Sequence, residues 1–319
     1  MSARKASKAS SKRLVREYIT AIAFFLPFFA LFVTFTILPV AMAIGFSFTT
    51  YSVVQAPVWI GVANYQRMFI EDDTFIIALQ NTFSFAVISG VIGYFLSFVV
   101  AWMIDNVKGR MFFALAFYAP SITGSIAMSV IWLTFFSPDS YGWINNALLQ
   151  LNIIDVPLLW NQNPDLILPM VCIVSVWMSM GTGFLSFLAG FQNLNKEISE
   201  AGLIDGVGNK FQELIYIIMP QMKPMMLFGA VNAVTAAFAV YDIPFAMAGS
   251  PGPENAALTL VGHINDYMFT RLDNGYASTI AVFLFAITFL ISRILFRVLT
   301  DHERPPRRKR SLPKGDATL

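Results

Sequence analysis

The sequence predicts an all-α protein that crosses a lipid bilayer six times, and three observations lead to this fold class. Only 13% of its 319 residues are charged and 56% are hydrophobic, whereas a soluble domain has about 25% charged residues. Six apolar stretches each reach the roughly 20 residues that a transmembrane helix needs. The alternating pattern of a membrane β-strand is absent, so these segments should satisfy their backbone hydrogen bonds as helices. The expected spans are about 18–49, 76–105, 111–137, 166–191, 223–248 and 276–300.

The first apolar stretch predicts a retained helix and not a cleaved signal peptide. Basic residues precede it, but its apolar run continues through Pro27 and Pro39, far beyond the roughly 7–15 residues of a signal-peptide core. We therefore expect a basic tail over residues 1–17, disordered to about residue 12, followed by a membrane domain over 18–302. A second basic tail is expected over 303–319.

The distribution of positive charge predicts the orientation of the chain. All but two of the 21 Lys and Arg residues fall in the two tails, at the end of the last span, or in the loops after the second and fourth spans; the exceptions are Arg67 and Arg271. The positive-inside rule places both termini and the loop over 192–222 in the cytoplasm. Next to a membrane helix, the basic run Arg307–Arg310 is more typical of contact with anionic lipid than of nucleic-acid binding.

The third span contains the run Pro120-Ser121-Ile122-Thr123-Gly124-Ser125. A proline inside a helix removes a hydrogen bond, so this run predicts a kink. The small residues around the proline favour helix packing or gating over a binding site.

The loop over 192–222 predicts two short capped helices beneath the bilayer. Asn195 is a good N-cap for the first, and Gly206 can end it because glycine tolerates a left-handed backbone. Asn209 can cap the second helix, and Met219-Pro220 is expected to end it, since proline disfavours helix in the preceding residue.

The same loop has the composition of a docking element. Ala201 and Gly202 are small enough for a partner surface to approach closely, and Glu200 and Asp205 supply charge for a basic groove. The residues alone support two interpretations about equally. The loop is either a docking element or an ordinary capped hairpin without a partner.

Polar residues within the fourth and fifth spans predict a water-filled path. Charged and polar groups are costly in a membrane, although a single Ser or Thr commonly serves helix packing and Asp242 could be an interfacial acid. On one continuous helix, Asn232, Thr235 and Asp242 would share a face, and so would Ser175 and Ser179. Hydroxyl-binding groups beside aromatic rings suit a sugar. The candidate path residues are Ser175, Trp177, Ser179, Asn232, Thr235, Phe238, Tyr241 and Asp242.

Several other function classes lack their sequence signatures. Cys172 is the only cysteine, and His263 and His302 show no ligand spacing, so no metal site is expected. No catalytic constellation and no Gly-x-x-x-x-Gly-Lys-Ser/Thr loop for ATP is present. A secondary active transporter of a small polar solute stays an alternative, although internal repeats and paired membrane acids are not evident. A membrane enzyme and an assembly factor are further alternatives.

Specific motifs resemble a known family. Glu200-Ala201-Gly202-x-x-Asp205-Gly206, followed by Ile217, Pro220 and Pro224, resembles the Glu-Ala-Ala loop of binding-protein-dependent ABC importer permeases. Gly202 stands where alanine is usual, and Pro220 comes one residue later than the usual spacing. Three further segments resemble the sugar-uptake branch, and the resemblance covers most of residues 20–300, closest to the maltose and glycerol-phosphate type. These segments are Trp59–Tyr65, Asn81-Thr82-Phe83 and Gly249–Pro253.

The resemblance implies the type I ABC importer permease (MetI-like) fold and a transport role in a bacterial cell (inner) membrane. Glu200, Ala201, Gly202, Asp205 and Gly206 would form a coupling helix on an ABC ATPase dimer, which would use ATP and Mg²⁺ while this chain binds no cofactor. A second, different permease chain and an extracellular or periplasmic solute-binding protein are the other implied partners. A sugar, above all an oligosaccharide, is the implied cargo. Glycerol-phosphate is less favoured, since the path spans carry no basic residue.

Overall fold

The computed structural model describes residues 2–249 and 251–300, with side chains from residue 17 onward. The expected tail over 303–319 lies outside these residues. The chain divides into two compact units, Met1–Glu71 with Ile264–Phe283 and Asp72–His263 with Leu284–Leu319. Each unit is described by itself.

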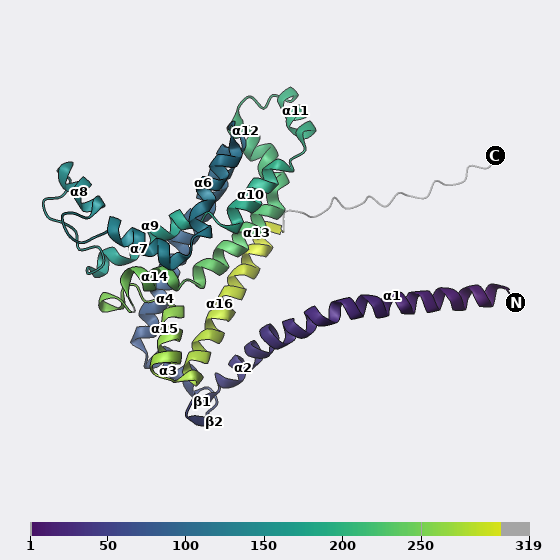
Figure 1. The fold of residues 1–319 in the computed structure, drawn as a ribbon, viewed down its shortest axis with the longest axis horizontal. Helices are drawn as coiled ribbons and strands as arrows, with labels where there is room; N and C mark the ends of the chain where they lie inside the picture. The colour runs from purple at the N-terminus through teal and green to yellow at the C-terminus, as the bar shows by residue number, and fades with distance from the viewer. Residues whose placement is uncertain (1, 250, 301–319) are drawn as a thin grey trace, which may run out of the picture. The chain divides into compact units, whose positions relative to one another are not determined.

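The first unit opens with a helical run that is longer than the sequence predicts. It consists of α1 (Ser2–Phe32), the π-helical turn η1 (Val33–Ile37) and α2 (Leu38–Phe46) (Figure 1). Helix α1 begins at Ser2, whereas the sequence suggested a disordered start and a tail to residue 17. Ala, Lys and Arg are good helix formers, and neither Gly nor Pro interrupts the chain before Pro27.

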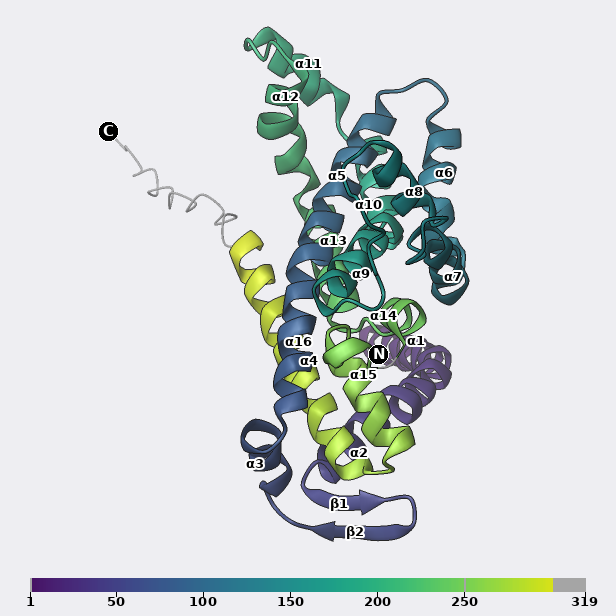
Figure 2. The ribbon, with the colours of Figure 1, turned by 90° about the vertical axis from the view of Figure 1, so that its left-hand side faces the viewer.

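A hairpin and a short helix follow in the first unit. Strands β1 (Thr49–Ser52) and β2 (Gln55–Trp59) pair antiparallel and precede α3 (Ala63–Ile70), as Figure 2 shows. The buried Asn64 amide donates to the carbonyl oxygens of Ser47 (3.2 Å) and Thr49 (2.9 Å). These bonds hold α3 on the chain that enters β1, so the fold is all-α apart from one hairpin.

The second unit begins with one long apolar helix. It comprises α4 (Asp73–Phe85), the π-helical turn η2 (Ala86–Val91) and α5 (Ile92–Asp105). Asp72 caps it, since its carboxylate accepts from the Phe75 N–H at 3.0 Å. Two further helices, α9 (Pro164–Met178) and α10 (Thr182–Gln192), form the fourth apolar segment, and α8 (Trp143–Gln150) precedes them.

The third apolar segment is broken and not merely kinked. Helices α6 (Arg110–Ile122) and α7 (Ser125–Phe135) meet at 97°. Pro120 weakens the last turn of α6, and Thr123 and Gly124 adopt extended ψ angles of 134° and 135°. Within the described residues, five helices are long and apolar enough to cross a membrane, or six if this bent pair counts as one span.

The fifth apolar segment differs from its prediction at both ends. One helix runs from Lys210 to Phe238, through α12 (Lys210–Glu213), the π-helical turn η3 (Leu214–Ile218) and α13 (Met219–Phe238). Met219-Pro220 therefore does not end a helix. The wider π turn directly before Pro220 accommodates a residue that cannot donate a backbone hydrogen bond.

Beyond Phe238 the chain leaves the helix and restarts as α14 (Asp242–Ala248), so the expected continuous span over 223–248 is wrong. The remaining elements are a 3₁₀ turn η4 (Pro253–Asn255), α15 (Leu260–Asn265), the π-helical turn η5 (Asp266–Thr270) and α16 (Asn274–Thr300).

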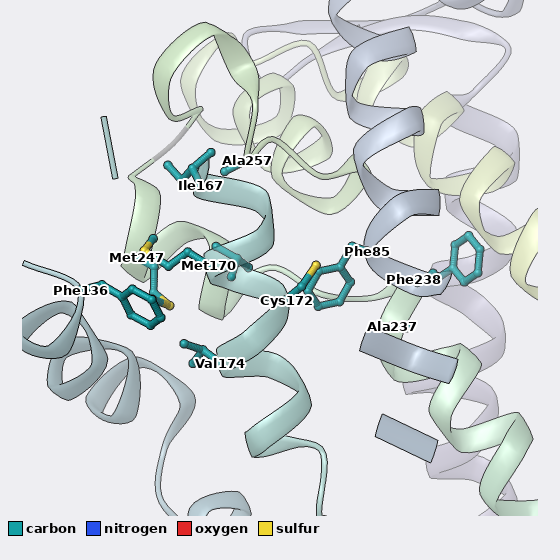
Figure 3. Packing of buried hydrophobic residues seen from close by; sticks show 12 residues of the cluster. Phe85, Phe136, Ile167, Met170, Cys172, Val174, Ala237, Phe238, Met247 and Ala257 are labelled. Atoms are coloured by element: carbon teal, nitrogen blue, oxygen red, sulfur yellow. The ribbon is translucent and has the colours of Figure 1, made fainter. Parts of the chain in front are cut away.

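Two buried apolar clusters support the second unit. The first centres on Ile167, Met170 and Val174 of α9, and Figure 3 shows Met170 and Cys172 between Phe136 on one side and Phe85 on the other. The second joins α5, α10 and α13 through Phe98, Phe187 and Met222, among others. Figures 1 and 2 show α11 (Lys196–Ile204) and the start of α12 beyond these clusters, at one end of the unit.

Candidate functional site

The caps of the polar segment over 192–222 lie where the sequence predicts them. The Asn195 side chain accepts from the Glu197 N–H at 2.9 Å and begins α11, and Gly206 ends it with a φ of +95°. The Asn209 side chain accepts from the Gln212 N–H at 2.8 Å and begins α12. Both side-chain oxygens satisfy N–H groups that a helix start leaves unpaired, so the turn between the helices is well defined.

The outer face of α11 combines acidic and apolar side chains. Glu200, Ala201, Asp205 and Gly206 are all exposed. Sequence reasoning missed that large apolar residues of this polar segment are exposed as well. They are Ile198, Leu203, Ile204 (87% exposed), Phe211 and Tyr216. Exposed apolar side chains clustered on a polar segment typically mark an interaction surface.

Gly202 faces the chain's own helix and not the outer surface. A Cβ atom at Gly202 would meet Cδ1 of Ile217, which is buried. The missing side chain thus lets α11 pack closely on η3, while Gly202 itself stays half-buried. Of the two small residues, only Ala201 is exposed.

A cavity of about 290 Å³ lies between α5, α9, α10 and α13 in the second unit. It brings together Ser175, Ser179 and Asn232, three of the expected path residues. Sequence reasoning missed Ser89, Ser97 and Thr182, which add hydroxyl groups from other turns. No charged side chain lines this cavity, and aromatic rings of Phe85, Tyr94 and Phe187 form part of its wall.

One hydroxyl group of the cavity is fully buried without a hydrogen-bond partner in the part of the chain that the structure describes. The buried Ser175 Oγ has no hydrogen-bond partner within the described residues. The Ser179 hydroxyl donates to the Val176 carbonyl at 2.6 Å, and the Asn232 amide donates to the Phe228 carbonyl at 2.9 Å. A buried polar group without a partner is costly, so Ser175 is the position at which a polar ligand would gain most.

Asp242 does not share a helical face with Asn232 and Thr235. The helix ends at Phe238, and Asp242 opens α14, where its carboxylate accepts from the Ser125 hydroxyl at 2.8 Å. Thr235 lies on the exposed side of α13 and donates to the Val231 carbonyl at 2.8 Å. The expected polar stripe is therefore divided among three environments.

The three aromatic residues expected along the path also lie outside the cavity. Phe238 is buried in the first apolar cluster with its edge toward Phe83. Trp177 contacts Trp132 edge to face, and Tyr241 stacks on Phe245. The ring contacts of all three are with the chain's own aromatic side chains.

Comparisons with known proteins agree on one family. A family model described as "Binding-protein-dependent transport system inner membrane component" matches residues 73–304. The probable ABC transporter permease protein YesP of Bacillus subtilis (strain 168) is 32% identical over 292 residues, which cover 90% of this chain and 92% of that protein. The arabinooligosaccharides transport system permease protein AraP of Halalkalibacterium halodurans is 31% identical over 83% of each chain.

A solved structure shares the fold. A chain of a bacterial ABC transporter involved in the import of the acidic polysaccharide alginate superposes with a TM-score of 0.77 at 20% identity. The superposition covers 93% of this chain and 100% of that chain.

Proposed function

Because this chain belongs to the family of binding-protein-dependent transport system inner membrane components, a family of multi-pass membrane proteins, we propose that it is the transmembrane subunit of an ATP-driven ABC importer for an oligosaccharide. Relatives named for arabinooligosaccharides, lactose and diacetylchitobiose support this cargo class. Transport would proceed by alternating access, in which the path opens in turn to each side of the membrane.

The mixed acidic and apolar face of α11 is the observation that carries the proposal. It offers burial of apolar area together with charge, the combination found at protein interfaces. Glu200, Ala201, Asp205 and Gly206 contact an ABC ATPase dimer on this face, with Gly202 holding α11 on η3. ATP and Mg²⁺ bind to that ATPase and not to this chain, which acts as a transport subunit without enzymatic activity of its own.

The remaining partners and the orientation follow from charge and from relatives. The distribution of Lys and Arg favours both termini and α11 in the cytoplasm of a bacterial cell. A second, different permease chain would complete the path in the inner membrane. One similar solved structure is a complex with an alginate pentasaccharide-bound periplasmic protein, which supports delivery by a solute-binding protein.

The cavity around Ser175 favours a neutral sugar. Its polar atoms come from hydroxyl groups and the Asn232 amide, and none of its lining side chains is charged. A carboxylate or phosphate group loses water when it enters a membrane cavity. Without a positively charged side chain in the cavity, nothing offsets the free-energy cost of this dehydration. A cargo without acidic groups therefore fits this chain better than an acidic saccharide such as the alginate of the structural relative.

The test is uptake into proteoliposomes that contain the complete importer with its binding protein. We expect uptake of a neutral oligosaccharide that requires ATP inside the vesicles, with little competition from an oligosaccharide of uronic acids. Uptake driven by a proton or sodium gradient without ATP would instead indicate a secondary active transporter.

A further inference from the structure

A second cavity, of about 430 Å³, lies at the end of the second unit that carries α11. Its wall combines the end of α5, the start of α6, the end of α10 and the first residues of α11 and α12. Trp102, Phe191 and Ile218 give it an apolar side. It shares no residue with the cavity around Ser175.

The polar side of this cavity carries more positive than negative charge. Arg110, Lys196 and Lys210 line it together with Asp105 and Glu213. Lys210 Nζ lies 2.9 Å from Glu213 Oε2, and Arg110 Nη1 lies 3.4 Å from Asp105 Oδ1. Lys196 has no ion-pair partner within the described residues, so one positive charge is uncompensated.

The position of two of these cations adds to the imbalance. Arg110 is the first residue of α6 and Lys196 is the first residue of α11. The start of a helix carries a partial positive charge, which makes a cation unfavourable there and an anion favourable. Two such placements around one cavity are explained if an anion occupies it.

We propose that this cavity binds the phosphate group of an anionic ligand. Guanidinium and ammonium groups are common hydrogen-bond donors to phosphate oxygens in proteins, and this cavity has one guanidinium and two ammonium groups. Its apolar side suits the carbon atoms that carry the phosphate. The ligand is the headgroup of an anionic phospholipid or a soluble phosphorylated solute. Basic pockets between membrane helices on the cytoplasmic side bind such headgroups.

A ligand here would connect the loop between α5 and α6 to the base of α11. Arg110 begins α6 directly after that loop, Lys196 begins α11, and Lys210 begins the helix that follows α11. A bound phosphate would therefore hold α11 in place and regulate its response to the ATPase. This regulatory consequence rests on the proposed function, whereas anion binding itself does not.

Binding is measured on the full chain in complex with its partner subunits. In nanodiscs of phosphatidylcholine, inorganic phosphate and glucose 6-phosphate are titrated at constant ionic strength, and retention of phosphatidylglycerol is measured by native mass spectrometry. The Lys196→Gln/Lys210→Gln variant is compared with Lys108→Gln. Lys108 is also an exposed lysine, in the loop between α5 and α6, but it does not line the cavity.

We expect the double variant to bind at least one probe about tenfold more weakly, whereas Lys108→Gln binds as the unmodified chain does. Binding of phosphatidylglycerol alone identifies a lipid headgroup, and binding of the soluble probes identifies a free phosphate compound. Equal affinities in both variants, equal losses in both variants, or no binding beyond that of chloride would overturn the proposal. An importer that fails to transport sugars but still shows the expected binding would contradict only the proposed function.

Discussion

Gly202 illustrates how a motif residue can serve the chain's own packing. Its backbone lies against Ile217, so an added methyl group would meet the end of that side chain. The family resemblance places alanine at this position, and glycine in this chain leaves room for the end of the Ile217 side chain.

We predict that the stability effect of Gly202→Ala depends on Ile217. In the unmodified chain the substitution lowers the thermal unfolding midpoint, because overpacking costs about 1–3 kcal/mol. In an Ile217→Val background, which removes Cδ1, Gly202→Ala raises the midpoint, since alanine favours helix by about 1 kcal/mol. Thermal unfolding of the purified chain measures both. The same shift in the two backgrounds would contradict the proposed contact.

Ser175 is the residue of the membrane cavity whose substitution is most informative. Its hydroxyl is buried and unpaired, so it is free to bond a sugar hydroxyl group. We predict that Ser175→Ala raises the sugar concentration needed for half-maximal uptake about fivefold. This factor corresponds to about 1 kcal/mol for one hydrogen bond.

Thr235→Val is the matched control for Ser175→Ala. Thr235 also carries a hydroxyl group, but it bonds to the Val231 carbonyl on the exposed side of α13 and does not line the cavity. Uptake by this variant should follow that of the unmodified chain. If Thr235→Val lowered uptake as much as Ser175→Ala, the path would follow the exposed face of α13 instead.

At the scale of elements, α11 is a short helix whose apolar residues are exposed rather than buried. Its caps define its ends, while its contact with η3 through Gly202 leaves Leu203 and Ile204 outside. An isolated helix of this length is marginal in water. Its order therefore depends on the caps and on packing against the helix that begins at Lys210.

We predict that Ile204→Ser weakens the association of the ATPase. Burying an isoleucine side chain contributes about 1.5–3 kcal/mol, so the affinity should fall at least about tenfold. Co-purification and quantitative binding of the ATPase in detergent measure this loss. Ile153→Ser is the control, because Ile153 is also strongly exposed but lies in the segment between α8 and α9. ATPase binding that is unchanged by Ile204→Ser would exclude α11 as the docking element.

At the scale of the whole molecule, charge and hydropathy predict one orientation in the membrane. Both of the exceptional cations, Arg67 and Arg271, are held by carboxylates in the first unit, at 2.8 Å from Asp273 and 2.7 Å from Asp266.

We predict that a membrane-impermeant maleimide distinguishes the two sides of this chain. Cys172 is the single cysteine of the sequence, so a Cys172→Ser background provides a chain without other thiols. Tyr141→Cys should be labelled in intact spheroplasts, whereas Asn193→Cys should react only after the membrane is opened; both positions are exposed. Labelling of Asn193→Cys in intact spheroplasts would reverse the proposed orientation.

The sequence by itself determined the apolar segments, the caps at Asn195 and Asn209, and the end of α11 at Gly206, because these depend on composition and on contacts within a few residues. It also carried the motif by which the family is recognised. Only the tertiary structure decided which residues share a site. The break after Phe238 moves Asp242 away from Asn232. Packing of η2 and α5 against α9 and α10 brings Ser89 and Ser97 to Ser175. Gly202 turns toward Ile217 for the same reason: these placements depend on contacts between distant segments, which local sequence patterns do not specify.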